Sequence, residues 1–206
     1  SRKFKDQDMI AGYDVMNEPV TDKTDLLHET LKEVVKVIRE NNDRHIIFLE
    51  GNNWARDIEP LKGLFSDNVA LSIHFYDPFK FTFDNDPKLT YPGKVDGLFW
   101  NKATIRDILH KYADFKVPVL VGEFGVAGSF KPDKLQWVKD MLEVFNDFGF
   151  HWSYWTYKSV AGTNFPDGIF TYPQGKEIRG MGNIGKQLLD NKTSFYEALD
   201  TKYFIL

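Results

Sequence analysis

Residues 12–19 read GYDVMNEP, an apolar run that ends in Asn17 and Glu18. A strand that enters a core should not finish on a carboxylate unless that carboxylate has a partner or a function, because an unpaired buried charge is costly. A second run, VPVLVGEFG at residues 117–125, carries Glu123 in the same position near its end. Two strand ends of this kind form a pattern, and the pattern indicates both a fold and a chemistry.

Five short apolar runs have the character of buried parallel strands. They lack the alternation of polar and apolar residues that marks a half-exposed antiparallel sheet. The runs are MIAGYDVM (9–16), HIIFLEG (45–51), VALSIHFY (69–76), VPVLVGEFG (117–125) and FHWSYWTY (150–157).

Apolar residues recur at helical spacing between these strands. The helices are predicted at about 25–38, 105–112, 135–145 and 193–204. Thr24 or Asp25 is available as the cap of the first helix. Pro132 and Asp133 open the third helix, and Gly149 closes it. Strand and helix therefore alternate without interruption, which predicts a parallel α/β fold.

Composition excludes several classes of function. The 206 residues suffice for one sizeable core and are few for two domains. The net charge of −4 gives no reason to expect nucleic acid or an anionic membrane as a partner. No apolar run approaches the roughly 20 residues of a membrane span, and the first residues, SRKFKDQD, show no signal-peptide pattern. Cysteine is absent, so disulfides, thiolate catalysis and cysteine-ligated metals are excluded.

Polar and aromatic groups close each predicted strand. These groups are Asn17 and Glu18, Glu50 to Trp54, His74 to Tyr76, Glu123, and Trp155 to Lys158. The C-terminal ends of parallel strands converge on one face of a sheet, and in a barrel that face carries the active site. Two converging carboxylates indicate glycoside hydrolysis, in which one carboxyl group protonates the leaving oxygen and the other attacks the anomeric carbon.

The ordered motifs DVMNEP, HFYDP, VLVGEFG and WSYWTYK resemble the fourth, sixth, seventh and eighth strands of glycoside hydrolase family 5, clan A. The resemblance covers essentially the whole chain. It implies an α/β fold, the (β/α)8 TIM barrel, of which this chain supplies about strands 4 to 8. It also implies that Glu18 is the catalytic acid/base and Glu123 the nucleophile. The implied substrate-binding residues are Asn17, His74, Tyr76 and Trp155.

The resemblance assigns a role to most of these residues. Asn17 would bond the 2-hydroxyl of the sugar under attack, Tyr76 would position the nucleophile, and Trp155 would support the sugar ring. The family retains anomeric configuration, so the two carboxyl groups are expected about 5 Å apart. No metal and no cofactor are implied. The expected partner is a β-linked oligo- or polysaccharide, and the expected location is extracellular.

The chain is short for this fold, since an eight-stranded barrel typically needs ~250 residues. The first three strands, with the Arg and His that they bring, have no counterpart here. Five strands cannot close a barrel without exposed edges. Residues 1–206 are therefore expected to be the C-terminal part of a single catalytic domain, completed by an N-terminal fragment, a second copy, or residues beyond this sequence.

Simpler interpretations stay open for individual residues. Glu18 alone is compatible with a structural carboxylate near a helix N-terminus, and Glu123 alone with a buried ion pair. Trp54 is equally compatible with packing and with a sugar subsite, and Glu50 is expected to be a hydrogen-bond partner rather than a catalyst. Trp152 and Trp155 should face opposite sides of their strand.

Three functional hypotheses follow. The first is a retaining β-glycosidase that acts within a β-linked glucan chain. The second is a mannan-active enzyme or another β-glycosidase. The third is a catalytically silent half-barrel that binds sugar without turnover.

Overall fold

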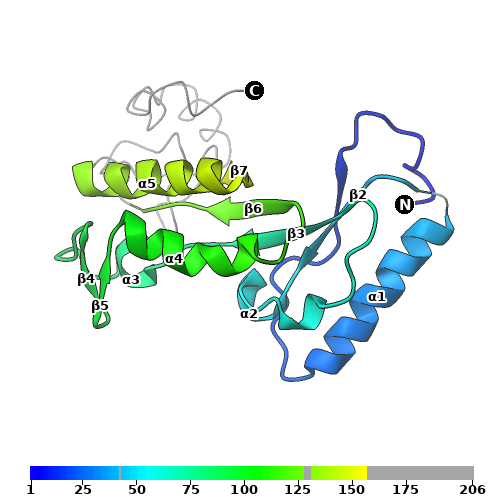
Figure 1. Cartoon of the computed structure of the whole chain (residues 1–206), viewed down its shortest axis with the longest axis horizontal. Helices are drawn as coiled ribbons and strands as arrows, with labels where there is room; N and C mark the ends of the chain where they lie inside the picture. Colours follow the sequence, from blue (N-terminus) through cyan, green and yellow to red (C-terminus); the bar gives the residue numbers. More distant parts are fainter. Residues whose placement is uncertain (42, 128–130, 157–206) are drawn as a thin grey trace, which may run out of the picture. The chain divides into compact units, whose positions relative to one another are not determined.

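The computed structural model describes residues 1–41, 43–127 and 131–156. Its elements are β1 (Gly12–Asp14), α1 (Thr24–Glu40), β2 (Ile46–Glu50), α2 (Asn52–Ala55), η1 (Glu59–Leu61), β3 (Val69–His74), α3 (Phe79–Thr82), β4 (Gly93–Val95), β5 (Leu98–Trp100), α4 (Lys102–Ala113), β6 (Val119–Phe124), α5 (Pro132–Phe148) and β7 (His151–Tyr154) (Figure 1). All five predicted strands are present as β1, β2, β3, β6 and β7. The predicted helix at about 193–204 lies outside the described residues.

The chain divides into two compact units. Unit 1 consists of Ser1–Phe75 and Tyr112–Gly122, and unit 2 consists of Tyr76–Lys111 and the residues from Glu123 onward. Strand β6 thus begins in unit 1 and ends in unit 2.

Unit 1 is built on parallel strands in the order β1-β2-β3-β6. Strand β1 pairs in parallel with β2, and β2 pairs in parallel with β3. The main chain of Leu71 in β3 donates to the carbonyl of Pro118, just before β6, at 2.9 Å. Every residue of β3 is buried, as a continuous apolar run predicts. Gly12 allows β1 to approach β2, since an added Cβ would lie 2.4 Å from the carbonyl oxygen of Ile46.

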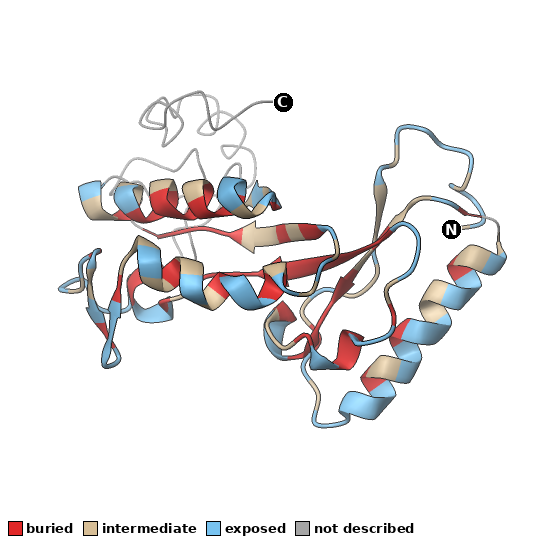
Figure 2. Ribbon diagram, viewed as in Figure 1, coloured by how far each residue is buried: buried red, intermediate tan, exposed pale blue. Residues whose placement is uncertain are grey.

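Helix α1 buries one face and exposes the rest (Figure 2). The buried face consists of Leu27, Leu31 and Ile38, and α1 packs against η1 through a 2.8 Å hydrogen bond between the His28 ring and the Pro60 carbonyl. The predicted cap of this helix is wrong. Lys23 occupies the N-cap position and makes no side-chain cap bond, because its ammonium group is a donor only, and Thr24 is already helical.

A buried carboxylate ties the first residues of the chain to β2. Asp43 is fully buried and accepts a 2.8 Å bond from the Tyr13 hydroxyl. His45 Nδ1 lies 2.6 Å from Asp43 Oδ1, and His45 Nε2 lies 3.0 Å from the Gln7 carbonyl. Both ring nitrogens face acceptors, so the doubly protonated ring is favoured. The Gln7 carbonyl and then the Asp43 carboxylate raise the pKa of His45.

This arrangement predicts a pH-dependent stability. A group whose folded pKa is raised contributes stability that is fully present below its unfolded pKa and is lost as pH rises through the folded pKa. We therefore expect the urea midpoint of the protein to fall as pH rises from the ordinary pKa of histidine, about 6.5, through the raised pKa of His45. His45→Gln should flatten this part of the pH profile. An unchanged slope in that variant would show that His45 does not carry the effect.

Unit 2 contains the C-terminal end of β6, together with β7 and α5. Helix α5 packs on β7. Helix α5 begins with Pro132 and ends at Gly149, whose φ of 69° is left-handed, as predicted. The Phe124 ring is the centre of the core, and the rings around it are Trp137, Phe145, Trp152 and Tyr154. Trp152 is thus half-buried against the Phe124 ring, whereas Trp155 is exposed; that the two face opposite sides stays a prediction.

The stretch 77–98, which follows β3, contains regular structure. Residues 79–82 form α3, and β4 pairs with β5 as an antiparallel hairpin. Asp96 and Gly97 connect the two strands with φ values of 50° and 87°. Asp-Gly is the strongest short sequence signal for such a turn, and it was present in the sequence.

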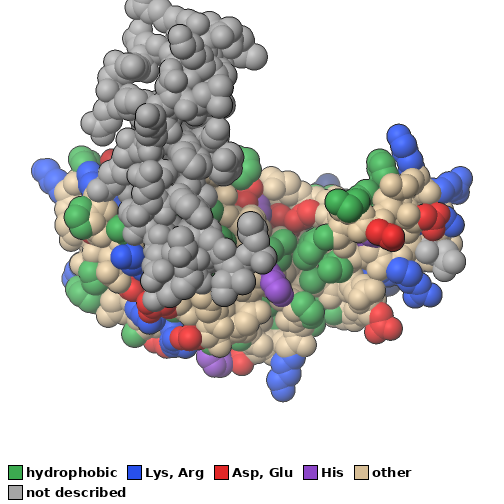
Figure 3. Space-filling view, turned by 90° about the horizontal axis from the view of Figure 1, so that it is seen from above, with side chains coloured by type: hydrophobic (Ala, Val, Ile, Leu, Met, Phe, Trp, Pro, Cys, Tyr) green, Lys and Arg blue, Asp and Glu red, His purple; other side chains and the backbone are tan. Residues whose placement is uncertain are grey.

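The surface of the described residues carries charges of both signs. Figure 3 shows Lys and Arg side chains interspersed with Asp and Glu side chains on the face in view. Among the described helices, none has the length and apolar character needed to cross a membrane.

Candidate active site

The loop after β1 brings Glu18 to the end of β2. The backbone N–H of Glu18 donates to Glu50 Oε2 at 2.6 Å. Glu18 has a φ of 46°, which is uncommon for a residue other than glycine and often marks a functional position. Its side chain is 30% exposed. The carboxyl group is therefore fixed at its base by Glu50 and remains accessible.

His74, the last residue of β3, connects the same two carboxyl groups. Its Nδ1 lies 2.7 Å from Glu18 Oε1, and its Nε2 lies 3.1 Å from Glu50 Oε1. His74 is only 3% exposed, so these carboxyl groups take the place of water around the ring. The structure thus brings Glu18 and His74, both predicted site residues, into direct contact within unit 1.

Glu50 is a buried hydrogen-bond acceptor, as expected from the sequence. Burial alone would raise its pKa, but the bonds from His74 and from the Glu18 N–H outweigh burial and lower the pKa of Glu50 below its ordinary value. Asp14, at the end of β1, hydrogen-bonds to Glu50 and accepts from the Ser72 hydroxyl at 3.2 Å. The sequence analysis missed Asp14. The signal was there, since Asp14 is a carboxylate inside an apolar strand.

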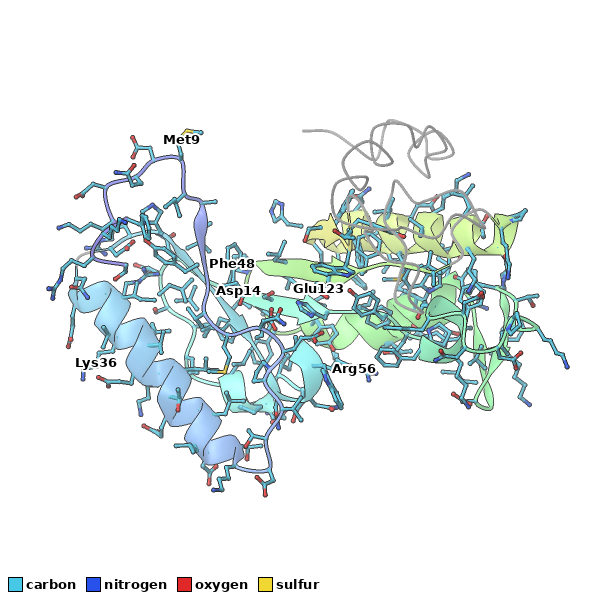
Figure 4. The ribbon with its side chains drawn as sticks, turned by 180° about the vertical axis from the view of Figure 1, so that it is seen from behind. Met9, Asp14, Lys36, Phe48, Arg56 and Glu123 are labelled. Carbon is cyan, nitrogen blue, oxygen red and sulfur yellow. The ribbon has the colours of Figure 1, made fainter. Side chains whose placement is uncertain are left out.

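Glu123 lies near the end of β6 and belongs to unit 2 (Figure 4). It accepts a 2.7 Å hydrogen bond from the Tyr76 hydroxyl. Tyr76 is 7% exposed, and its ring makes an edge contact with Phe83 at 5.4 Å between centroids. Thr82 Oγ1 donates to the Tyr76 carbonyl at 2.5 Å. The phenol is thus held by packing and by its backbone, and a donated O–H favours the ionised form of a carboxylate.

Trp155 follows β7, the strand next to β6. Its N–H donates to the carbonyl of Phe124 at 2.9 Å, which places Trp155 beside the strand end that carries Glu123. Its side chain is 47% exposed, so the ring is available to a ligand. The peptide bond from Trp155 to Thr156 is cis.

The other residues of interest have simpler surroundings. Asn17 is exposed beside Glu18. Trp54 is 51% exposed and is not part of the core of the described residues. Lys158, Asn164 and Asp167 lie outside the described residues.

The structure therefore forms two pairs of the predicted residues. Glu18 is paired with His74 in unit 1, and Glu123 is paired with Tyr76 in unit 2. The predicted separation of the two carboxyl groups stays a prediction. The two carboxyl groups have different partners, an imidazole and a phenol, and such a difference is how acid and nucleophile roles are separated.

Comparison with known proteins begins with a family model. The model for cellulase, glycosyl hydrolase family 5, matches residues 1–160. Among curated proteins, the chain is 26% identical over 174 residues to a beta-xylosidase of Phanerodontia chrysosporium, covering 78% of this chain and 36% of that protein. It is 23% identical over 195 residues to Endoglucanase C of Acetivibrio thermocellus, covering 77% of this chain and 57% of that protein. The chain thus spans only part of the length of these relatives.

Solved structures of endoglucanases are also similar to this chain. An endoglucanase matches with a TM-score of 0.65 and 26% identity, over 89% of this chain and 61% of that one. A hyperthermophilic endo-β-1,4-glucanase in complex with substrate matches with a TM-score of 0.68 and 23% identity, with the same coverage. The predicted fold class is confirmed, because these neighbours are (β/α)8 barrels and the chain has the fold of part of one.

Proposed function

Because the chain belongs to glycosyl hydrolase family 5, we propose that it is the C-terminal part of a retaining endo-β-1,4-glucanase. The observation that carries the proposal is the 2.7 Å bond from the Tyr76 hydroxyl to Glu123, which holds one carboxylate ready for attack. The endoglucanases among its relatives support a β-linked glucan as substrate.

In the first step, Glu123 attacks the anomeric carbon and forms an ester to the sugar. Glu18 gives its proton to the glycosidic oxygen, so the leaving part of the chain departs as a neutral alcohol. In the second step, Glu18, now a carboxylate, takes a proton from water as the water displaces Glu123. The product keeps the original anomeric configuration, and both carboxyl groups return to their starting states.

The neighbouring residues support these steps. Tyr76 donates to Glu123 before attack, and His74 orients Glu18 through Oε1. Asn17 binds the 2-hydroxyl, and the exposed Trp155 ring supports the apolar face of the sugar.

The barrel must be completed before this chemistry can run. The chain covers 57% of Endoglucanase C and 61% of the endoglucanase structure. We propose that an N-terminal fragment, a second copy or further residues of the same protein supply the remaining strands.

A trapped intermediate tests the mechanism. An activated 2-fluoro glucoside forms the ester to the nucleophile but hydrolyses slowly, so the denatured protein should gain the mass of one sugar. We expect the added mass on the peptide that contains Glu123, and any companion chain should appear in the same spectrum. Glu123→Gln, the matched control, should stay unlabelled.

The other outcomes are also decisive. Labelling of a different carboxylate would refute the assignment of Glu123. No label and no companion chain would indicate an inactive half-barrel. No label with a companion present would count against a glucose-accepting site, and a 2-fluoro mannoside would then test mannan activity.

A further inference from the structure

A continuous series of hydrogen bonds lies behind Glu18 in unit 1. Ser72 Oγ donates to Asp14 Oδ2 at 3.2 Å, and Asp14 hydrogen-bonds to Glu50. Glu50 Oε1 lies 3.1 Å from Nε2 of His74, whose Nδ1 lies 2.7 Å from Glu18 Oε1. Figure 4 labels Asp14, which belongs to β1, the first strand in the order of this sheet. The proposed mechanism uses only its last two members.

Asp14 and Glu50 form a pair of interacting carboxyl groups. Two hydrogen-bonded carboxyl groups resist being ionised together, so one of them keeps a proton. Glu50 is the ionised member, because it accepts from the Glu18 N–H and faces His74. Asp14 is then the protonated member and donates to Glu50. Although the Asp14 residue lies along an exposed edge, partial burial of its carboxyl group, followed by the Glu50 charge, raises the pKa of Asp14 to about 7.

The ionised Glu50 fixes the protonation of His74. Nε2 of His74 faces the Glu50 carboxylate, so this nitrogen carries a proton. The ring is almost completely buried and its two nitrogens face Glu50 and Glu18, so rotation of the ring would break both contacts. The charge on Glu50 thus decides how His74 meets Glu18 Oε1.

Four strands of unit 1 surround this series, and each of them either provides a member or has no titratable side chain there. β1 provides Asp14, β2 provides Glu50, and β3 provides Ser72 and His74. The part of β6 in unit 1, residues 119–122, has no titratable side chain. It ends in Gly122, where an added Cβ would lie 3.0 Å from Ser72 Oγ and 3.4 Å from His74 Nε2. The absence of a side chain there leaves room for the hydrogen bonds.

We propose that Asp14 and Glu50 are positioning residues for the acid/base: their shared proton keeps Glu50 aligned on His74, which fixes the orientation of Glu18. Loss of that proton weakens glycosidic bond cleavage at alkaline pH. This proposal rests on the proposed role of Glu18. It extends that role, since neither Asp14 nor Glu50 is assigned by the resemblance.

Loss of the shared proton would leave two adjacent carboxylates that repel each other. Glu50 would then turn away from Asp14 and lose its alignment with His74. Glu18 would lose its fixed partner, and proton delivery to a poor leaving group would suffer. An activated leaving group, which departs without a proton, should be much less affected.

Two variants of the complete enzyme test the proposal. Asp14→Asn keeps an N–H donor toward Glu50 but cannot ionise, so the alkaline limb of kcat/KM on cello-oligosaccharides should move to higher pH. Glu50→Gln removes the charge opposite His74. It should lower kcat/KM on cello-oligosaccharides by about 10- to 100-fold, a part of the 10²–10⁴ that general acid catalysis contributes. On a dinitrophenyl glycoside, the loss should be under about threefold.

Controls separate this proposal from the proposed function. Glu29→Gln, an exposed carboxylate of unit 1, should leave both profiles unchanged. Glu18→Gln is measured in parallel. The loss of kcat/KM in Glu18→Gln should depend on the leaving group. If it does, but Glu50→Gln lowers kcat/KM equally on both substrates, the positioning role is wrong and the proposed function stands. If Glu18→Gln shows no such dependence, the proposed function itself fails.

The proposal stays testable if Glu50→Gln does not fold. Asp14→Asn keeps the size and shape of the side chain, and its pH profile alone then decides. An alkaline limb that coincides with that of the unmodified enzyme would overturn the shared-proton role.

Discussion

Glu123→Gln is expected to lower kcat/KM for glucan hydrolysis by roughly 10⁴-fold or more, as loss of a catalytic nucleophile does in other enzymes. Glutamine has the size of glutamate, and its amide oxygen can still accept from the Tyr76 hydroxyl, which lies 2.7 Å from the native carboxylate. The amide cannot attack the anomeric carbon, so the covalent path is closed while the local packing is kept. Release of reducing ends from a β-glucan measures the loss.

The matched control is Glu143→Gln. Glu143 is a partly exposed carboxylate of unit 2 that pairs with Lys102 on the surface, and its replacement should leave kcat/KM unchanged. Residual activity of Glu123→Gln above a few per cent of the unmodified enzyme would contradict the assignment. Equal losses in both variants would point to general damage of unit 2.

The strands could be predicted because their signals are local. The runs that form β3 and β6 are mostly apolar and are bounded by polar residues. This pattern can be recognised from the sequence alone. Parallel strands bring their C-terminal ends to one edge, which placed Tyr76 and Glu123 on the same face of the sheet; their pairing was implied by the family resemblance and is present in the structure. The family's ordered motifs then supplied the roles.

The missed features have physical reasons. The N-cap of α1 is Lys23, one residue before the two residues predicted to cap it, and it makes no side-chain cap bond. Two capping residues in sequence do not tell which one has non-helical dihedral angles. The Asp96–Gly97 hairpin, by contrast, has a local signal in the sequence, the Asp-Gly pair at its turn.

Asp14 shows a limit of reading strands by hydrophobic pattern. A single carboxylate inside GYDVM looks like an interruption, and only the neighbouring strands show that it meets Ser72 and Glu50. The partners are 58 and 36 positions away along the chain, so no local pattern contains them. Polar networks between strands are thus the part of a site that a single sequence hides best.

Glu18→Gln is expected to separate two classes of substrate. For a glucan, whose leaving alcohol needs a proton, kcat/KM should fall by about 10²–10⁴-fold, the usual contribution of a general acid. For a dinitrophenyl glycoside, the first step needs no proton, so kcat/KM should stay within about threefold. The second step still lacks its base, so kcat should fall and the ester should accumulate. Stopped-flow release of dinitrophenol, with a burst followed by a slow phase, measures both effects.

Added azide then distinguishes the two carboxyl groups, because azide attacks without a base. In Glu18→Ala, azide should displace Glu123 from the ester and give the β-glycosyl azide, with retention of configuration. In Glu123→Ala, azide should take the place of the nucleophile on the opposite face and give the α-glycosyl azide from an activated β-glycoside. If Glu18→Gln is as inactive on the dinitrophenyl glycoside as on glucan, or if the two azides are exchanged, the roles of Glu18 and Glu123 are assigned wrongly. Two products of opposite configuration would tie each carboxyl group to one face of the sugar ring.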